Sequence, residues 1–236
     1  YAEAPAQGFL PQTGRVASWA PRLQDGVRID HGLIESQEIS PFYDPLLGKI
    51  IAHGQTREEA RRKLLRAVQD CVLLGVQSNQ RLLVSLLQHP QFIGGEFSTG
   101  FIEQHFAEHS SLQRQVPSAE HLAIAAALFY QASAQAHPVA LAGWRNNASV
   151  PLHYRLALDD QDWPVALHAV PGEPLRVEVA SRHLELKIIQ SDGRWATVQL
   201  DGVRQRHAYR MEAGQLWLFT APGSLRLVDR TQAPAC

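Results

Sequence analysis

The sequence is poor in cysteine and has no long hydrophobic run. Only two of its 236 residues are cysteines, Cys71 and Cys236. Two are too few for the disulfide framework of a secreted protein, so we expect a reducing compartment. No apolar run approaches the ~20 residues that a membrane-spanning helix requires. The residues after Tyr1 lack a basic segment followed by an apolar stretch, so we expect no signal peptide here, and the missing initial Met suits a segment of a longer chain.

An excess of charge of either sign is also missing. The 22 Lys and Arg residues nearly balance the 23 Asp and Glu residues, which leaves a formal net charge of −1 at pH 7. Such a chain has no overall field that attracts nucleic acid or an anionic membrane, so we expect neither as a partner. Hydrophobic residues make up 45% and charged residues 19% of the chain, a balance that favours a buried core over disorder. The length allows one large domain or two ordinary ones.

The first half of the chain mixes short strands with helices. Thr56 and Glu59 form a capping-box pair that predicts the start of a helix. Apolar residues at 3.6 spacing from Ala60 to Val72 continue this helix until Gly75. We expect strands at 14–19, 27–34 and 46–53. We also expect one helix that starts at Ser78, buries Leu82, Leu83, Leu86 and Leu87 and stops before Pro90, and another from Thr99 that carries Phe101, Ile102, His105 and Phe106.

A long alanine-rich helix is predicted after a polar connection. It starts at Pro117-Ser118 and reaches about Ala136. Alanine costs no side-chain entropy in a helix, and its small size lets other elements approach closely. We expect one apolar face on this helix, formed by Leu122, Ala125, Ala126 and Phe129.

From Leu152 onward apolar residues alternate with polar ones, which is the period of half-buried strands. Eight such segments, separated by turns such as Asp192-Gly193 and Asp201-Gly202, predict an antiparallel barrel or sandwich. The simplest packing wraps these strands around the apolar helix. The tryptophans of this half are expected to fill its core, namely Trp163, Trp195 and Trp217.

A run of motifs in the first half is the most informative feature. It consists of Gly26-Val27-Arg28, Pro41-Phe42-Tyr43-Asp44-Pro45-Leu46-Leu47-Gly48-Lys49, His53-Gly54-Gln55-Thr56-Arg57-Glu58-Glu59-Ala60 and Gly75-Val76-Gln77-Ser78-Asn79. This order and spacing closely resemble the C-terminal end of a biotin carboxylase domain. The match is closest to the biotin-carrying α subunits of acyl-CoA carboxylases, above all the 3-methylcrotonyl-CoA type, with the propionyl- and geranyl-CoA types as alternatives.

The helix and the alternating strands resemble a second part of the same subunits. There, a long helix enclosed by a β-barrel lies between the carboxylase domain and the biotinyl domain, and it docks the α subunit onto the carboxyltransferase β subunit. The motif Gly143-Trp144-Arg145-Asn146 resembles that family's connection. The resemblance implies an α+β chain in three parts: the C-terminal part of an ATP-grasp biotin carboxylase domain at 1–109, a helix enclosed by an approximately eight-stranded antiparallel barrel at 110–230, and a linker toward a biotinyl domain at 231–236.

Arg28 is the one candidate for catalysis and for contact with biotin. The resemblance places it where biotin carboxylases have an arginine that faces the ureido ring. Removing a proton from a urea nitrogen leaves negative charge on the ureido oxygen, and a fixed guanidinium stabilises that charge where it develops. The alternative is a strand arginine in a surface ion pair worth ~0.2–1 kcal/mol. The resemblance favours the catalytic role in the intact enzyme.

Five further residues of these motifs are assigned no catalytic role. We expect Tyr43, Asp44 and Lys49 to be structural. Asp44 begins a turn, and Lys49 lies in an apolar strand, where a buried lysine needs a carboxylate and Asp44 is the nearest in sequence. His53 and Arg57 match the edge at which biotin carboxylase domains pair. The resemblance therefore makes them candidates for contacts between α subunits, against an alternative as ordinary surface residues.

A zinc-peptidase pattern occurs at His105-Phe106-Ala107-Glu108-His109. On a helix, its two histidines would face the same way and could share a metal. However, the pattern is short, the chain has 11 histidines that make chance matches easy, and a third ligand is required. We therefore favour a polar helix end and predict no metal site there.

The resemblance also implies an activity for the intact subunit. It would carboxylate biotin with ATP, bicarbonate and magnesium or manganese, and the β subunit would pass the carboxyl group to an acyl-CoA, with 3-methylcrotonyl-CoA favoured. This sequence has no Gly-rich phosphate loop. The resemblance covers only the C-terminal end of the carboxylase domain and the part before the biotinyl domain. It therefore implies that the chain lacks the ATP site and the biotinyl lysine, binds no cofactor alone, is inactive, and acts in assembly.

The expected partners are the carboxyltransferase β subunit, other α subunits and the biotinyl domain. The bacterial cytoplasm is the favoured location, or the mitochondrial matrix if the source is eukaryotic. Two other classes of protein stay open at this point: a stand-alone interaction module and a barrel that binds a small ligand.

Overall fold

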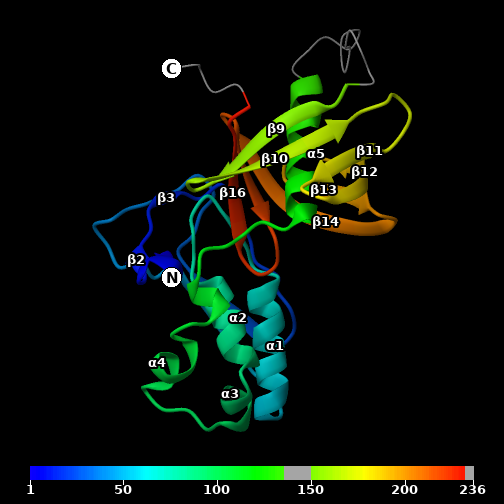
Figure 1. Cartoon of the computed structure of the whole chain (residues 1–236). Coiled ribbons are helices and arrows are strands. Elements are labelled where there is room, and N and C mark those ends of the chain that lie inside the picture. The colour runs from blue at the N-terminus through cyan, green and yellow to red at the C-terminus, as the bar shows by residue number, and fades with distance from the viewer. Residues whose placement is uncertain (136–149, 232–236) are drawn as a thin grey trace. The chain divides into compact units, whose positions relative to one another are not determined.

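The computed structural model describes residues 1–135 and 150–231 (Figure 1). The chain divides into two compact units. Unit 1 comprises Tyr1–Gln115 and Phe219–Ser224, and unit 2 comprises Val116–Leu218 and Leu225–Cys236. The connection motif at 143–146 and the thiol of Cys236 lie outside the described residues. None of the helices within the described ranges is both long and apolar enough to cross a membrane.

The described part of unit 1 contains strand pairs and short helices. The antiparallel pairs are β1 (Glu3–Ala4) with β2 (Leu10–Pro11), β3 (Gly14–Arg15) with β6 (Glu38–Ile39), β4 (Ser18–Ala20) with β8 (Val72–Leu74), and β5 (Val27–His31) with β7 (Gly48–Ala52). The helices are α1 (Arg57–Gln69), α2 (Gln80–Gln88), α3 (Pro90–Gly94) and α4 (Phe101–Phe106), with 3₁₀ turns η1 (Pro5–Gln7) and η2 (Ser110–Leu112).

The capping box of α1 is present with one difference from the expected pattern. The Thr56 hydroxyl accepts a hydrogen bond from the backbone N–H of Glu59 at 3.1 Å. The Glu59 carboxylate accepts one from the N–H of Gln55 at 2.8 Å, whereas a standard box would use the N–H of Thr56 itself. Two N–H groups at the start of the helix are thereby satisfied, and such a cap stabilises a helix by about 1 kcal/mol.

The end of α1 was predicted wrongly. The helix stops at Gln69, and the apolar residues that follow are not its continuation. Cys71 begins a run of four buried apolar residues, of which Val72 to Leu74 form β8 and pair with β4. A run that is apolar at every position suits a fully buried strand as well as a buried helix, and here the pairing with β4 decides for the strand.

The apolar face of α2 is rotated from the predicted one. Leu82 and Leu87 are buried as expected and Leu86 is half-buried, but Leu83 is 37% exposed and Val84 is buried in its place. A pattern of four leucines in two adjacent pairs does not say which member of each pair faces inward. The neighbours of α2 make that choice, and the sequence around α2 does not contain them.

Pro90 ends α2 and also starts α3, a helix that the sequence did not predict. The His89 ring caps α3, since its Nδ1 accepts a hydrogen bond from the N–H of Gln91 at 3.3 Å. Proline is well suited to the first position of a helix, because the N–H that it lacks would have no partner there. The prediction treated Pro90 only as a stop signal.

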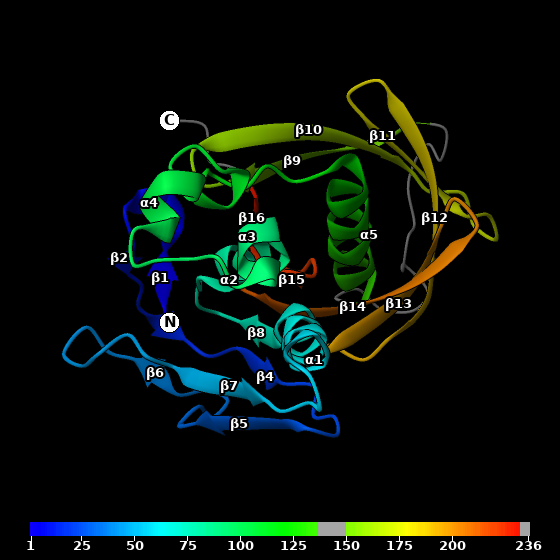
Figure 2. The same ribbon diagram turned by 90° about the horizontal axis from the view of Figure 1, so that it is seen from below.

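Several small clusters hold the described part of unit 1 together. Their buried members are Val16, Leu33 and Leu73; Val68, Val84 and Leu87; and Leu82, Phe101 and Phe106. Figure 2 shows β5 and β7 side by side, and α1 packs against β7, β5 and α2. This packing half-buries one face of the β5–β7 pair and leaves the other face open.

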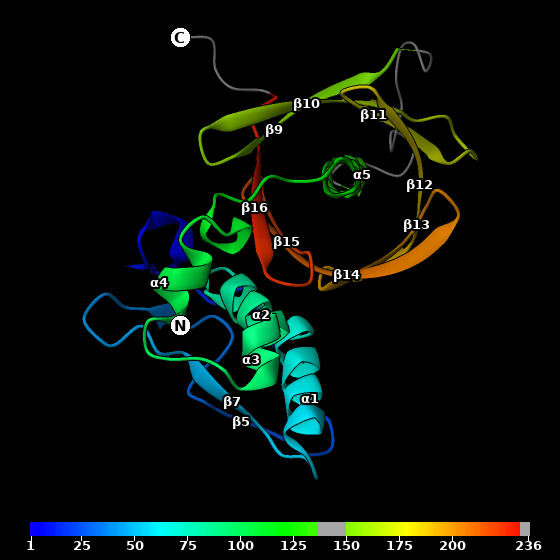
Figure 3. The same cartoon turned by 60° about the horizontal axis from the view of Figure 1, so that its bottom comes forward.

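Unit 2 is a helix inside a closed barrel, so the predicted fold class is confirmed. The helix is α5 (Ala119–Gln135). The strands are β9 (Leu152–Leu158), β10 (Gln161–His168), β11 (Leu175–Val179), β12 (Arg182–Ser191), β13 (Trp195–Leu200), β14 (Val203–Glu212), β15 (Gln215–Phe219) and β16 (Ser224–Asp229). Each strand pairs with the next along the chain, and β16 pairs with β9 to close the ring. Figure 3 shows α5 end-on within this ring.

The helix α5 is buried on all sides, as expected of an apolar helix around which the strands wrap, and not only on the face named from the sequence. All eight residues at 122–129 are at most 7% exposed. Because a helix turns once every 3.6 residues, eight consecutive buried positions point in every direction. The short side chains of its four buried alanines leave room for the inward leucines of the strands, which include Leu156, Leu167, Leu186, Leu216, Leu218 and Leu227.

The predicted tryptophan core of unit 2 is largely wrong. Trp163 packs against the core cluster, but Trp195 and Trp217 alternate with the buried residues Ala196 and Leu216, so they face outward. The ring of Trp195 instead lies under the Arg206 guanidinium, 4.3 Å from its centroid. The side chains that face the core of unit 2 are therefore predicted by their position along each strand and not by the size of their rings.

Candidate functional site

The β5–β7 pair carries the candidate residue Arg28 on its open face. Register places Arg28 opposite Ile51 and Asp30 opposite Lys49. Side chains alternate across a strand, so these four residues share one face. All four are exposed. The other face of the pair is half-buried against α1.

Arg28 and Asp30 form an ion pair with two contacts. The Arg28 Nε lies 3.0 Å from Asp30 Oδ1, and Nη2 donates to Oδ2 at 3.2 Å. The side chains are 72% and 52% exposed, so the pair contributes no more than ~1 kcal/mol to stability. This is the surface ion pair that the sequence left open as an alternative. Among the described residues, no acceptor binds the second N–H of Nη2 or the two N–H groups of Nη1, and these could donate to an anion.

The loop before β7 is exposed and contradicts one expectation. Phe42 and Tyr43 are 89% and 84% exposed. The Asp44 carboxylate accepts a hydrogen bond from the N–H of Leu46 at 2.7 Å, which is the predicted turn. Lys49 is exposed rather than buried, so it does not require Asp44 as a buried partner. Side chains alternate between the two faces of a strand, and this alternation places Lys49 on the same open face as Arg28.

His53 and Arg57 differ in how the fold uses them. The Arg57 guanidinium donates to the carbonyl of Phe92 at 2.8 Å and lies 5.1 Å from the Phe92 ring centroid and 5.8 Å from that of Phe97. Arg57 thus ties the start of α1 to α3. The side chain of His53 is exposed, and its carbonyl accepts from Lys63 Nζ at 3.3 Å.

The zinc-peptidase pattern does not form one helical face. Helix α4 ends at Phe106, between the two histidines. His109 lies beyond it and caps η2, since its Nδ1 accepts from the N–H of Ser111 at 3.1 Å. Within the described ranges, no group of three or more His, Cys, Asp or Glu side chains is placed to hold a metal ion.

Unit 1 also contains an apolar cavity of about 290 Å³. It lies among β5, β7, α1 and α2, and its lining includes Ile29, Ile50, Val68, Leu87 and the thiol of Cys71. Burial raises the pKa of the Cys71 thiol to about 12. At neutral pH this cysteine is therefore a thiol and not a nucleophilic thiolate.

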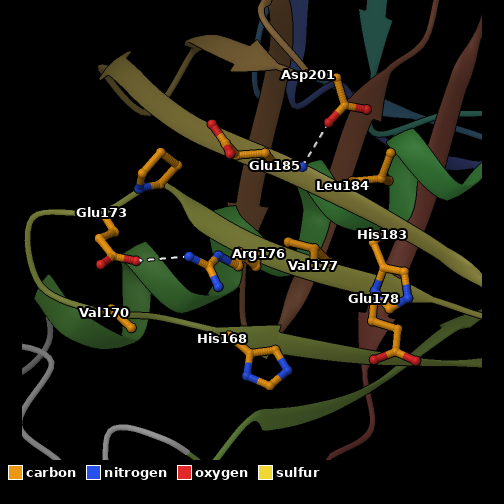
Figure 4. A pocket seen from close by; sticks show the side chains of 11 residues that line it. His168, Val170, Glu173, Arg176, Val177, Glu178, His183, Leu184, Glu185 and Asp201 are labelled. Atoms are coloured by element: carbon orange, nitrogen blue, oxygen red, sulfur yellow. Dashed lines mark hydrogen bonds and ion pairs between the residues drawn. The ribbon is translucent and has the colours of Figure 1, made fainter.

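Unit 2 carries a polar hollow of about 640 Å³ on strands β10, β11 and β12 (Figure 4). Its charged side chains alternate with the buried residues Val177 and Leu184, so they lie on the outer face of the barrel. Glu173 pairs with Arg176 at 3.3 Å, and the Asp201 carboxylate accepts from the N–H of Glu185. Four side chains of the hollow form no hydrogen bond or ion pair with any described residue, namely His168, Glu178, His183 and Glu185.

Comparison with known families accounts for both halves of the chain. Residues 1–104 match the family model of the biotin carboxylase C-terminal domain. Residues 118–232 match that of the BT domain of the methylcrotonyl-CoA carboxylase alpha-subunit. The two halves of the chain belong to these two domain families. The resemblance that the motif run and the alternating strands suggested is confirmed.

The chain is also similar to longer curated proteins. It is 38% identical over 128 residues to the mitochondrial methylcrotonoyl-CoA carboxylase subunit alpha of Dictyostelium discoideum, 53% of this chain and 18% of that protein. It is 39% identical over 110 residues to the mitochondrial propionyl-CoA carboxylase alpha chain of Caenorhabditis briggsae, 46% and 15%. It is 35% identical over 102 residues to biotin carboxylase 1 of Bacillus subtilis (strain 168), 43% and 23%. The chain thus spans less than a quarter of these relatives.

Two features of the biotin carboxylase C-terminal domain and the BT domain escaped prediction from sequence. The first is the contact between Arg28 and Asp30, although an Arg-x-Asp spacing on a strand signals that both side chains share a face. The second is the hollow of the BT domain. Its residues come from three strands and two turns, and their proximity can be predicted only when the register between strands is known.

Proposed function

We propose that this chain is part of the α subunit of an acyl-CoA carboxylase, an ATP-dependent ligase that carboxylates biotin. The observation that carries the proposal is the order of two domain families in one chain, a biotin carboxylase C-terminal domain followed by a BT domain. The named relatives include α subunits that act with methylcrotonoyl-CoA or propionyl-CoA. We favour 3-methylcrotonyl-CoA because the BT model is that of the methylcrotonyl-CoA carboxylase.

In this proposal Arg28 faces the ureido oxygen of biotin. Deprotonation of the ureido nitrogen puts negative charge on that oxygen, and a guanidinium stabilises it more in the transition state than in neutral biotin. The uncommitted N–H groups of Arg28 on the open face of β5 support this role, because they are free to donate. Arginine stays protonated at any physiological pH, so the positive charge is always present.

The remaining parts of the reaction are placed outside this chain. ATP, bicarbonate and magnesium or manganese would bind in the rest of the biotin carboxylase domain, and biotin would be carried by a biotinyl domain. In the 236 residues we find no Gly-rich phosphate loop. We place a bacterial form of the enzyme in the cytoplasm and a eukaryotic form in the mitochondrial matrix, in keeping with the two relatives named as mitochondrial.

The BT domain would dock the carboxyltransferase β subunit. The hollow on β10, β11 and β12 supports this role, because Glu178 and Glu185 hold charges without partners in the described residues. A facing surface with arginine or lysine would pair with them. The small-ligand alternative is less well supported, because the side chains of α5 occupy the interior of the barrel.

Binding to purified β subunit tests the docking role of this chain directly. The two proteins are mixed and separated by size-exclusion chromatography. Co-elution in a stable complex supports the proposal, whereas separate elution at micromolar concentration contradicts it.

Contact between α subunits through His53 and Arg57 is a separate part of the proposal. Their replacement by alanine in the complete subunit is expected to lower its mass in sedimentation.

A further inference from the structure

We infer that Asp30 is a positioning residue for Arg28 and holds its guanidinium with one edge turned toward the ureido oxygen. The inference rests on the proposed function, because it concerns the residue assigned to face biotin. It adds a second residue of this chain to that site, and Asp30 itself need not touch the substrate.

The atoms of the contact carry the inference. A guanidinium has a side edge, formed by Nε and one terminal nitrogen, and an end edge, formed by the two terminal nitrogens. Asp30 takes the side edge of Arg28, with Nε to Oδ1 at 3.0 Å and Nη2 to Oδ2 at 3.2 Å. The end edge keeps Nη1 and one N–H of Nη2 for another acceptor. Two parallel contacts fix the plane of the group as well as its position.

The strand β5 makes this arrangement local and rigid. Positions two apart on a strand lie on the same face, about 7 Å apart along the chain, so no loop has to move for the pair to form. The backbone of both residues is registered against β7, with Asp30 opposite Lys49. The Arg28 side chain is 72% exposed, and among the described residues the contact with Asp30 is the one that restrains its rotamers.

The net charge of the open face explains why the Asp30 carboxylate can lie next to a site for the ureido oxyanion. The charges of Arg28 and Asp30 sum to zero, and a neutral pair alone would attract a developing oxyanion only weakly. Lys49 lies in register with Asp30 on the same exposed face, and cross-strand neighbours of this kind are close enough to interact. With Lys49 the face carries one net positive charge, so Asp30 can orient the guanidinium without reversing the field.

The first test uses this chain and needs no activity. The Nε–H of Arg28 is assigned by NMR, and its exchange with water is measured in the wild type and in Asp30→Ala. We expect the Arg28 signal to lose protection in Asp30→Ala. Asp70→Ala is the matched control, because it removes the partner of a different exposed arginine, Arg22. Unchanged Arg28 exchange in Asp30→Ala would overturn the inference.

The second test uses the complete α subunit and measures the rate of biotin carboxylation. We expect Asp30→Ala to lower kcat on the order of 10²-fold, the loss typical of a misplaced catalytic group, with KM for ATP unchanged. Asp30→Glu should recover part of the rate, and Arg28→Ala/Asp30→Ala should be no slower than Arg28→Ala alone. If Arg28→Ala is inactive while Asp30→Ala is fully active, positioning by Asp30 is wrong. If Arg28→Ala is itself fully active, the proposed role of Arg28 fails as well.

Discussion

The ring of His121 and the backbone of Ser118 are joined at the start of α5. The N–H of Ser118 donates to Nδ1 of His121 at 3.3 Å, and the Ser118 hydroxyl accepts from the N–H of His121 at the same distance. The imidazole therefore acts as an acceptor, which requires an unprotonated Nδ1. Burial is the main cause that lowers the pKa of His121, and repulsion from His207 adds to it, while Glu120 acts in the opposite direction.

The first prediction is that unit 2 loses stability as the pH falls below about 6.5. In the unfolded chain His121 takes up a proton near its ordinary pKa of 6.5, whereas in the folded chain it does so only at lower pH. Between the two pKa values the unfolded state binds more protons than the folded state, so the free energy of unfolding decreases as the pH falls. Well above pH 6.5 His121 is unprotonated in both states and causes no such loss. Urea unfolding at pH 5 and pH 7.5 measures the difference.

A matched pair of variants isolates the contribution of His121. His121→Gln should make the pH dependence of unfolding shallower, because the group that titrates is gone. His153→Gln changes an exposed histidine of β9 and should leave the slope as it is. An unchanged slope in His121→Gln would show that other groups cause the acid sensitivity.

The second prediction concerns the helix inside the barrel. Phe129→Asp places a carboxylate where the native side chain is 7% exposed and belongs to the core of unit 2. Burying an unpaired charge costs several kcal/mol, so we expect unit 2 to unfold. Gln135→Asp adds the same charge at an exposed position of α5 and should have little effect. Circular dichroism and thermal melting compare the two, and a Phe129→Asp protein with wild-type melting would contradict the enclosed helix.

The third prediction is that Cys71 resists alkylation in the folded protein. Its pKa of about 12 leaves almost no thiolate at pH 8, and the residue is 6% exposed. In Cys236→Ser, which keeps Cys71 as the only cysteine of the sequence, iodoacetamide should react only after denaturant is added. Intact mass measurement follows the reaction. Rapid labelling under native conditions would mean that the cavity beside Cys71 is open to reagents.

The fourth prediction concerns the hollow of the BT domain. Glu178→Lys/Glu185→Lys reverses two charges without partners in the described residues and should weaken binding to the β subunit by about tenfold or more, because like charges would then face each other. Glu212→Lys reverses an exposed charge at the end of β14 and should bind like the wild type. Calorimetric titration of the β subunit measures both. If the wild type, the double variant and Glu212→Lys bind with equal affinity, the hollow is not the docking surface.

Much of the fold could be predicted because its signals are local. The period-two segments gave all eight barrel strands, and the Thr56–Glu59 cap gave the start of α1. The errors arose where a tertiary contact decides. Cys71 to Leu74 are apolar at every position, and only pairing with β4 makes part of that run a strand. Trp195 and Trp217 were assigned by ring size, whereas strand register turned them outward.

The candidate site was predictable in part for the same reason. Arg28 was found through the motif run. The Arg-x-Asp spacing places Arg28 and Asp30 on one face of the strand, but it does not say that this face is the open one. Lys49 was expected to be buried because its neighbours are apolar, and alternation on β7 placed it on the open face. The contact between Arg28 and Asp30 depends on rotamers, which a sequence pattern does not specify.

The most direct measurement is the rate of biotin carboxylation by the complete α subunit carrying Arg28→Ala. Loss of one donor to a developing oxyanion typically costs on the order of 10²–10³-fold in kcat, and we predict a loss of that size. The melting temperature should stay close to the wild-type value, because the exposed pair with Asp30 is worth no more than ~1 kcal/mol. Arg22→Ala, which removes another exposed, ion-paired arginine of unit 1, should keep the wild-type rate. A wild-type carboxylation rate in Arg28→Ala would contradict the account.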